Sequence, residues 1–132
     1  MLDSNVLMHL ANRSAGHEHI MQKLLEVEPS GCCVSSIVAF ELKRKILRGD
    51  GKKVERAALD ELLSLFKVLS FDDDAANWSA YVASELEISG KKIGSYDTLI
   101  AGHAMSTGLV LVTDNVREFQ RTGQPLENWR AP

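Results

Sequence analysis

The sequence predicts an α/β fold in which helices cover both faces of a parallel sheet. Short apolar runs that could form strands alternate with longer segments whose apolar residues recur at helical spacing. The strand-like runs carry apolar side chains in succession, which is typical of parallel strands that are buried on both faces. Ligands of such sheets bind in the crevice at the carboxyl ends of the strands.

The beginning of the chain predicts a strand, a helix and a second strand. Residues 1–2 and 32–35 are short apolar runs of strand type. Between them, Ile20, Leu24 and Leu25 are spaced for one face of a helix.

Two helices are expected next. Ser36 can cap a helix that runs toward Leu47 and is stopped by Gly49. A second helix is indicated by an apolar stripe at i, i+3, i+4 and i+7, formed by Leu59, Leu62, Leu63 and Phe66.

The remainder of the chain predicts two more strands and two more helices. Residues 68–71 are of strand type, and the acidic run 72–74 begins a helix, where acids favour the helix dipole. Residues 99–105 predict a mostly buried helix, and residues 109–113 form the most apolar strand. The helix that begins at residues 72–74 has an apolar stripe formed by Trp78, Val82 and Leu86.

Length and composition suit one folded domain, which we expect to span residues 1–132. The chain is 45% hydrophobic and 25% charged, and its length permits a real core. No apolar run approaches the ~18 residues of a membrane span, and no secretory signal is visible. The two cysteines, Cys32 and Cys33, are adjacent, which excludes a disulfide framework and does not support a cysteine zinc site. We expect a cytoplasmic protein.

Several carboxylates lie where local structure does not explain them all: Asp3, Glu41, Asp97, and one of Asp114 or Glu118. A carboxylate beside a core element is costly unless it is paired, hydrogen-bonded or bound to metal. Acids gathered in one fold are what a divalent cation needs, and oxygen-only ligands favour Mg²⁺ or Mn²⁺ over zinc.

Simpler interpretations exist for these acids. Asp3 could cap the following helix, and Asp97 could be a first-turn acid that favours a helix dipole. Glu41 lies in mid-helix, where a capping role is impossible, although a solvent-facing position remains open. Among the histidines, none has metal-ligand spacing, and His103 is expected to have a packed or supporting role.

The net charge of −3 excludes a uniformly basic nucleic-acid binder, but residues 43–56 are locally basic. Such a patch could bind the phosphates of a nucleic acid, and it follows directly after Glu41; the alternative is a solvated helical surface. The candidate RNA-binding residues are Lys43, Arg44, Lys45 and Arg48, followed in the same patch by Lys52, Lys53 and Arg56 against Asp50 and Glu55.

Four segments of the chain form a recognisable pattern: Met1-Leu2-Asp3-Ser4-Asn5, Ser35-Ser36 with Glu41-Leu42, Gly94 to Ala104, and Val112 to Phe119. Together they resemble the PIN-domain ribonucleases, and most closely the VapC-type toxins of bacterial toxin–antitoxin pairs. The resemblance covers the whole chain in order.

This resemblance implies a three-layer α/β/α sandwich with a central, mostly parallel sheet. It also implies a Mg²⁺- or Mn²⁺-dependent endoribonuclease toxin, a homodimer, and an antitoxin protein that blocks the acidic pocket. Asp3, Glu41 and Asp97 match the first three acids of the family. Glu118 matches the fourth, whereas many relatives have Asn at the place of Asp114. Relatives of this subgroup often cut structured RNA such as transfer RNA.

The expected reaction is hydrolysis of a phosphodiester bond. Asp3 and Asp97 are expected to bind metal directly, and Glu41 to bind it through water or to orient the attacking water. Glu118 or Asp114 would complete the site. Waters around the site would be positioned by Ser36, Thr113 and Asn115. Attack by water should leave 5′-phosphate and 3′-hydroxyl ends.

Two other functions remain in view. A phospho-receiver signalling domain is also an α/β fold with acids at strand ends, but it needs a phosphoacceptor Asp after a middle strand. Here the strand around Val34 ends in Ser35-Ser36. A non-catalytic RNA-binding PIN scaffold would be favoured by loss of acids, and the first three are all present.

Overall fold

The computed structural model describes residues 1–49 and 53–132, apart from the side chain of Val54. Its strands form two parallel pairs. β1 (Cys33–Ser35) pairs with β2 (Lys67–Leu69), and β3 (Leu111–Val112) pairs with β4 (Leu126–Glu127).

Residues 1–3 join the two pairs into one sheet. The Leu2 N–H donates to the Cys33 carbonyl at 2.8 Å, and Leu2 forms a parallel bridge with Val112. The Asp3 N–H donates to the Val112 carbonyl at 2.9 Å. The strand order is therefore β2, β1, residues 1–3, β3, β4, and the pairings β1–β2, Leu2–Val112 and β3–β4 are all parallel. This arrangement confirms the predicted parallel sheet, and it places Asp3 where its central segment ends.

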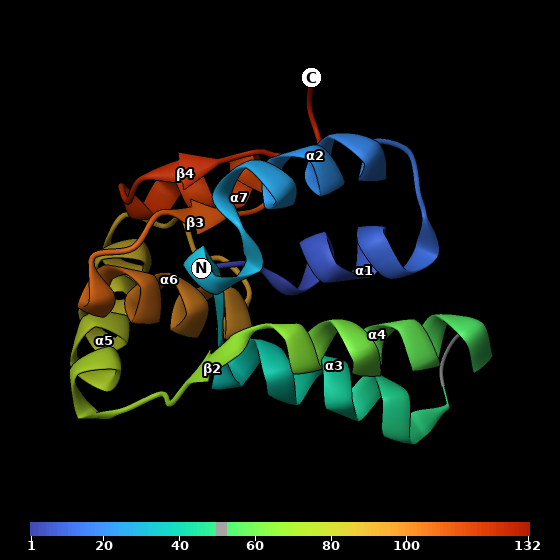
Figure 1. Cartoon of the computed structure of the whole chain (residues 1–132). Helices are drawn as coiled ribbons and strands as arrows, with labels where there is room; N and C mark the ends of the chain where they lie inside the picture. Colours follow the sequence, from blue (N-terminus) through green and yellow to red (C-terminus); the bar gives the residue numbers. More distant parts are fainter. Residues whose placement is uncertain (50–52) are drawn as a thin grey trace.

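The helices lie on both sides of this sheet. Figure 1 shows α1, α3 and α4 extending to one side of strand β2, with α5 and α6 on the opposite side. The seven α-helices of the described part are α1 (Ser4–Asn12), α2 (His17–Val27), α3 (Ser36–Arg48), α4 (Lys53–Leu65), α5 (Asp73–Ile88), α6 (Ser95–Thr107) and α7 (Val116–Phe119). Short 3₁₀ turns occupy Pro29–Gly31 and Gln120–Thr122.

Helix α3 begins one residue earlier than its predicted cap. Ser35 is the N-cap, and its Oγ accepts the Ile37 N–H at 3.1 Å. Ser36 is already helical, and its Oγ accepts the Phe71 N–H at 3.0 Å, which ties α3 to the segment after β2. The prediction of Ser36 as the cap was wrong because either serine can supply the hydroxyl, and only the end of β1 decides between them.

Other helix ends follow the sequence. Gly49 and Gly108 end α3 and α6 in the left-handed region, with φ of 71° and 66°. Asp72 caps α5, and its Oδ1 accepts the Ala75 N–H at 2.9 Å. The acidic run 72–74 is therefore a helix start, as predicted.

The apolar stripes bury most of the residues expected of them. Leu59, Leu63 and Phe66 are buried, as is the segment 100–104 of α6. Leu25 is 74% exposed, so its assignment to the buried face of α2 was wrong. It follows Leu24 directly, and consecutive helical residues point about 100° apart.

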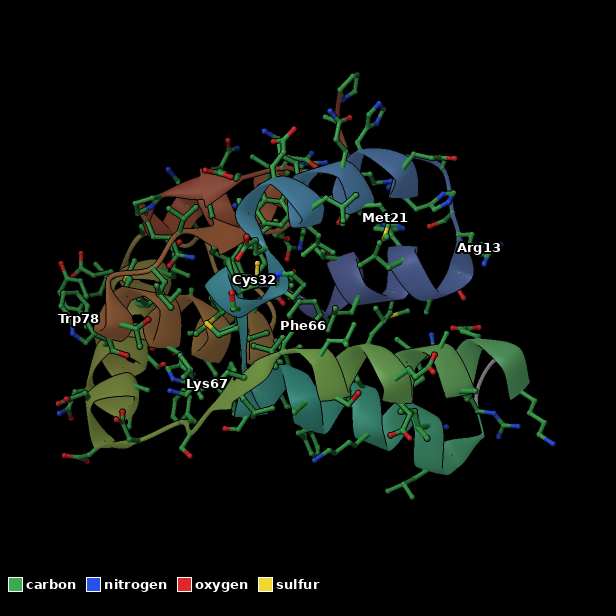
Figure 2. The ribbon with its side chains drawn as sticks, viewed as in Figure 1. Arg13, Met21, Cys32, Phe66, Lys67 and Trp78 are labelled. Carbon is green, nitrogen blue, oxygen red and sulfur yellow. The ribbon has the colours of Figure 1, made fainter. Side chains whose placement is uncertain are left out.

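Trp78 was also wrongly assigned to a buried face, and it is 45% exposed. The buried side of α5 is centred on Ser79, which packs so closely on α6 that a β-carbon at Gly102 would overlap the Ser79 backbone. The Ser79 hydroxyl donates to the Leu99 carbonyl at 3.3 Å. Trp78 consequently points outward and meets Tyr81 edge-on; Figure 2 shows its side chain at the outer surface of the molecule.

Candidate active site

Four elements bring acidic side chains to the carboxyl edge of the sheet. Asp3 ends the central segment, Glu41 lies on α3, Asp97 lies in the first turn of α6, and Glu118 lies on α7. Asp97 is close enough to the other three for each of their charges to raise its pKa. The structure therefore brings together four of the five acids singled out in the sequence.

Asp3 is buried and has both oxygens hydrogen-bonded. Its Oδ1 accepts the Ser4 N–H at 2.8 Å, and its Oδ2 accepts the Thr113 hydroxyl at 2.8 Å. Burial raises the pKa of Asp3 above its usual value, although these hydrogen bonds oppose the change. Asp3 thus caps α1 with one oxygen, as the simpler interpretation held, and still presents a buried charge at the strand end.

Glu41 is half-buried rather than solvent-facing. Burial raises the pKa of its carboxyl, the charge of Asp3 adds to this effect, and Arg44 opposes it. The Oε1 atom of Glu41 is buried and accepts no hydrogen bond from the described residues. Glu41 lines a hollow of about 210 Å³ together with Ser4 and Arg44. A buried oxygen without a donor is a candidate ligand for a cation or a water.

The Asp97 carboxyl has a strongly raised pKa. Burial first, and then the charges of Asp3, Glu118 and Glu41, raise its pKa to about 7. The cap of α6 is Gly94, which makes no side-chain capping bond. Asp97 can still favour the dipole of α6, but burial and the three neighbouring carboxylates disfavour its charged form.

Glu118 and Asp114 have different surroundings. The Glu118 Oε2 accepts the Asn115 side-chain N–H at 3.2 Å, and the Glu118 carboxyl is close enough to Asp97 to raise the pKa of Asp97. The Asp114 Oδ2 lies 2.7 Å from His9 Nε2 and accepts an Arg130 N–H at 2.9 Å. Glu118 therefore lies beside Asp97, whereas Asp114 takes part in a contact between α1 and the C-terminal segment. The charge of Asp114 nevertheless contributes to the raised pKa of Asp3.

Of the three polar residues expected to support the site, two lie beside the acids and one does not. The Thr113 hydroxyl donates to Asp3 and accepts the Asn115 N–H at 3.0 Å, so both residues are next to the acids. Ser36 instead accepts the Phe71 N–H and lines a separate groove. His103 is buried, which lowers its pKa, and its Nδ1 lies 2.8 Å from Ser35 Oγ.

The basic residues form a surface beside Glu41. Arg44 lies over two aromatic rings, those of Phe40 and Tyr96. Lys45 pairs with Glu55 at 3.4 Å. Lys43 and Arg48 line a groove together with Arg44, while Asp50 and Lys52 lie outside the described residues.

Sequence reasoning missed two arrangements. The contact of Asp114 with His9 and Arg130 joins positions 105 and 16 residues away, and no local pattern signals it. The pairing of Phe40 with Tyr96 had a signal, because each of these aromatic residues directly precedes a candidate acid.

The acidic group fits a hard divalent cation. Its donors are all carboxylate oxygens, one of which is buried without a partner, and their mutual repulsion would be relieved by positive charge. No three His, Cys, Asp or Glu side chains in the described ranges are already arranged as a metal cage. Mg²⁺ does not require one, because it usually keeps several waters and takes only one or two carboxylates directly.

None of the described helices is both long and apolar enough to cross a membrane.

Comparisons with known proteins agree with this geometry. The model of the family "PIN domain" matches residues 1–125. The tRNA(fMet)-specific endonuclease VapC of Salmonella typhimurium is 35% identical over 130 residues, which are 98% of this chain and 96% of that protein.

Solved structures give the same result. VapBC2 from Rickettsia felis, bound to a DNA fragment from its promoter, superposes with a TM-score of 0.85 at 29% identity, covering 98% of this chain and 97% of the other. VapBC-5 from Mycobacterium tuberculosis, a member of the VapBC family of toxin-antitoxin systems, gives 0.59 at 25% identity, covering 72% and 78%.

Proposed function

This chain belongs to the PIN-domain family, and within it to the VapC ribonucleases, and from that membership we propose that it is a metal-dependent endoribonuclease toxin. The cofactor we propose is Mg²⁺ or Mn²⁺, and the proposed catalytic group is Asp3, Glu41, Asp97 and Glu118. The observation that carries this proposal is the convergence of these acids, where burial together with the charges of the other three raises the pKa of Asp97 to about 7. Perturbed carboxylates gathered at one edge of a sheet are typical of functional sites.

Asp3 and Asp97 are the proposed direct ligands. The hydroxyl of Thr113 and the N–H of Ser4 fix the orientation of the Asp3 carboxylate. Asn115 fixes Glu118, which lies against Asp97. When bound, the cation would lower the pKa of a water and neutralise charge on the phosphate.

Glu41 is the proposed group that orients the attacking water and takes its proton. Its Oε1 needs a donor, and its raised pKa brings its basicity closer to what proton transfer requires. In-line attack by this water on phosphorus would break the bond to the 3′ oxygen of the preceding nucleotide. The products would carry 5′-phosphate and 3′-hydroxyl ends, and the 2′-hydroxyl would take no part.

We further propose that the substrate is a structured RNA such as transfer RNA, which the name of the Salmonella relative supports. An antitoxin partner is supported by the toxin-antitoxin family of the similar Mycobacterium structure. We also propose that the protein forms a homodimer and is cytoplasmic, and that residues 1–132 act as one nuclease domain.

Sequencing of RNA 5′ ends tests this function. RNA would be taken from cells that briefly express the chain, and from matched cells that express Asp97→Asn. We expect a small set of new 5′-phosphate ends in the first culture and none in the second. Identical end profiles in the two cultures would contradict the proposal and favour a non-catalytic PIN scaffold.

A further inference from the structure

Two aromatic rings and one guanidinium form an exposed cluster beside the acids. The rings of Phe40 and Tyr96 meet edge-on, with centroids 5.6 Å apart and an interplanar angle of 67°. The guanidinium carbon of Arg44 lies 5.8 Å from each ring centroid. We call Phe40, Tyr96 and Arg44 the aromatic platform.

The platform is next to the proposed catalytic group. Phe40 directly precedes Glu41 in α3, and Tyr96 directly precedes Asp97 in α6. The charge of Arg44 also reaches Glu41 and lowers its pKa against the effect of burial. A nucleotide on the platform would therefore adjoin the one whose phosphate reaches the acids.

The platform leaves apolar ring surface in water. Phe40 is 47% exposed and Tyr96 is 37% exposed. A single exposed aromatic residue needs no explanation, but a paired set held against a guanidinium presents flat surface suited to another flat group. Bases of single-stranded nucleic acids stack on such aromatic and arginine surfaces.

The charge around the platform suits a polyanion. A groove of about 550 Å³ is lined by Phe40 and Arg44 together with Lys43 and Arg48. Arg44 and Arg48 also line the hollow that contains Glu41, so the two depressions share a basic wall. A strand leaving the acids could lay its phosphates along this wall while a base rests on the rings.

We propose that the aromatic platform stacks an unpaired base of the RNA immediately beside the cleaved phosphodiester bond. Arg44 then has two parts in this surface: its flat guanidinium, held over the rings, extends the platform, and its charge contributes to the basic wall. Since every base has a flat face, the platform would hold this nucleotide with little preference for its identity. This inference rests on the proposed function, because it takes RNA as the ligand of the site.

The test is binding of a short RNA to protein that cannot cut it. In an Asp97→Asn background, the Kd of a fluorescein-labelled seven-nucleotide single-stranded RNA would be measured by anisotropy with Mg²⁺ present. Changing Phe40 and Tyr96 together to Leu should weaken binding about 5- to 150-fold per base lost, whereas Phe40→Tyr with Tyr96→Phe should preserve it. The matched control changes Trp78 and Tyr81 to Leu, because this pair is also exposed and edge-on but lies on α5; it should leave the Kd unchanged.

A series of RNAs with one abasic position each locates the stacked base and does not depend on the Leu variants folding. On the intact platform, one position, or two adjacent ones, should lose affinity and the others should not. Uniform loss, or no loss at any position, would overturn the proposal. So would an unchanged Kd in a folded Leu double variant.

Two further measurements distinguish base stacking on the platform from the proposed nuclease function and from a protein-docking surface. Metal-dependent cleavage by protein with intact Asp97, measured in parallel, tests the proposed function alone, and its absence would refute that function whatever the platform does. If the Leu double variant binds RNA normally but no longer captures the protein encoded by the adjacent reading frame, the surface is a protein-docking site and the platform proposal is wrong.

Discussion

Replacing Asp97 by Asn should stabilise the protein when divalent metal is chelated. The substitution keeps the shape of the side chain and removes one charge from a group of mutually repelling carboxylates. Burial and the neighbouring charges of Asp3, Glu118 and Glu41 raise the pKa of Asp97 from 3.8 to about 7. A change of this size corresponds to about 4 kcal/mol of unfavourable free energy for the ionised folded protein. Because the carboxyl is only half-buried and solvent screens it, we expect about 2 kcal/mol.

The effect should depend on pH in a defined direction. The pKa of Asp97 is higher in the folded than in the unfolded protein, so ionisation destabilises the fold. The penalty is absent below about pH 4, grows as pH rises toward 7, and is complete above pH 7. The advantage of Asp97→Asn should therefore be near zero at pH 4 and largest at pH 8.

Thermal unfolding in chelator at several pH values measures this difference. For a domain of this size, about 2 kcal/mol corresponds to a Tm higher by about 5–10 °C at pH 8. Added Mg²⁺ should then raise the Tm of the wild type more than that of the variant. Asp74→Asn is a matched control, because Asp74 is an exposed acid in the first turn of α5; it should lower the Tm slightly. If Asp97→Asn melts lower at pH 8 and gains as much from Mg²⁺ as the wild type, Asp97 is a helix-dipole residue and the site must be redrawn without it.

Three further outcomes are expected. Glu118→Gln should reduce the RNA cleavage rate at saturating Mg²⁺ more than Asp114→Asn does, because Asp114 is engaged by His9 and Arg130; the opposite order would reverse this assignment. Gly102→Ala should lower stability by about 2 kcal/mol in a chemical melt, because its β-carbon would overlap the Ser79 backbone, and an unchanged midpoint would contradict this packing. Co-expression with the adjacent small reading frame should restore growth and yield a co-purifying complex; failure with both neighbouring frames would count against the toxin function but not against the nuclease.

The fold class was predictable because buried positions of helices and strands recur at a regular spacing, which is visible as a pattern of apolar residues in the sequence. Strands covered on both faces need consecutive apolar residues, and the helices between them need apolar residues at helical spacing. Strand β4 (Leu126–Glu127) was not predicted, because no apolar run surrounds its two residues; β3 is equally short but lies within the apolar run 109–113. Leu25 and Trp78 were misplaced because spacing alone does not fix which side of a helix meets its neighbour.

The acidic residues were predictable for a different reason. Glu41 in mid-helix among apolar residues conflicts with local structure, and such conflicts mark functional sites. Asp3 caps α1, and it was singled out by its position directly after a strand, at the edge where parallel sheets bind ligands. The choice between Asp114 and Glu118 could not be made from local pattern, because the partners of Asp114 come from distant positions. In the sequence alone, Glu118 was favoured over Asp114 only because the segment Arg117–Phe119 resembles the family.

Cleavage of RNA by the purified protein tests the central claim most directly. Wild-type protein and Asp97→Asn would be incubated with a purified structured RNA, with Mg²⁺ or with EDTA, and the ends of the products identified. We predict discrete products with 5′-phosphate and 3′-hydroxyl ends from the wild type in Mg²⁺, and almost none in EDTA or from Asp97→Asn. Cleavage by Asp97→Asn at near wild-type rate, or undiminished cleavage in EDTA, with contaminating nuclease excluded, would contradict a carboxylate-held metal at this site.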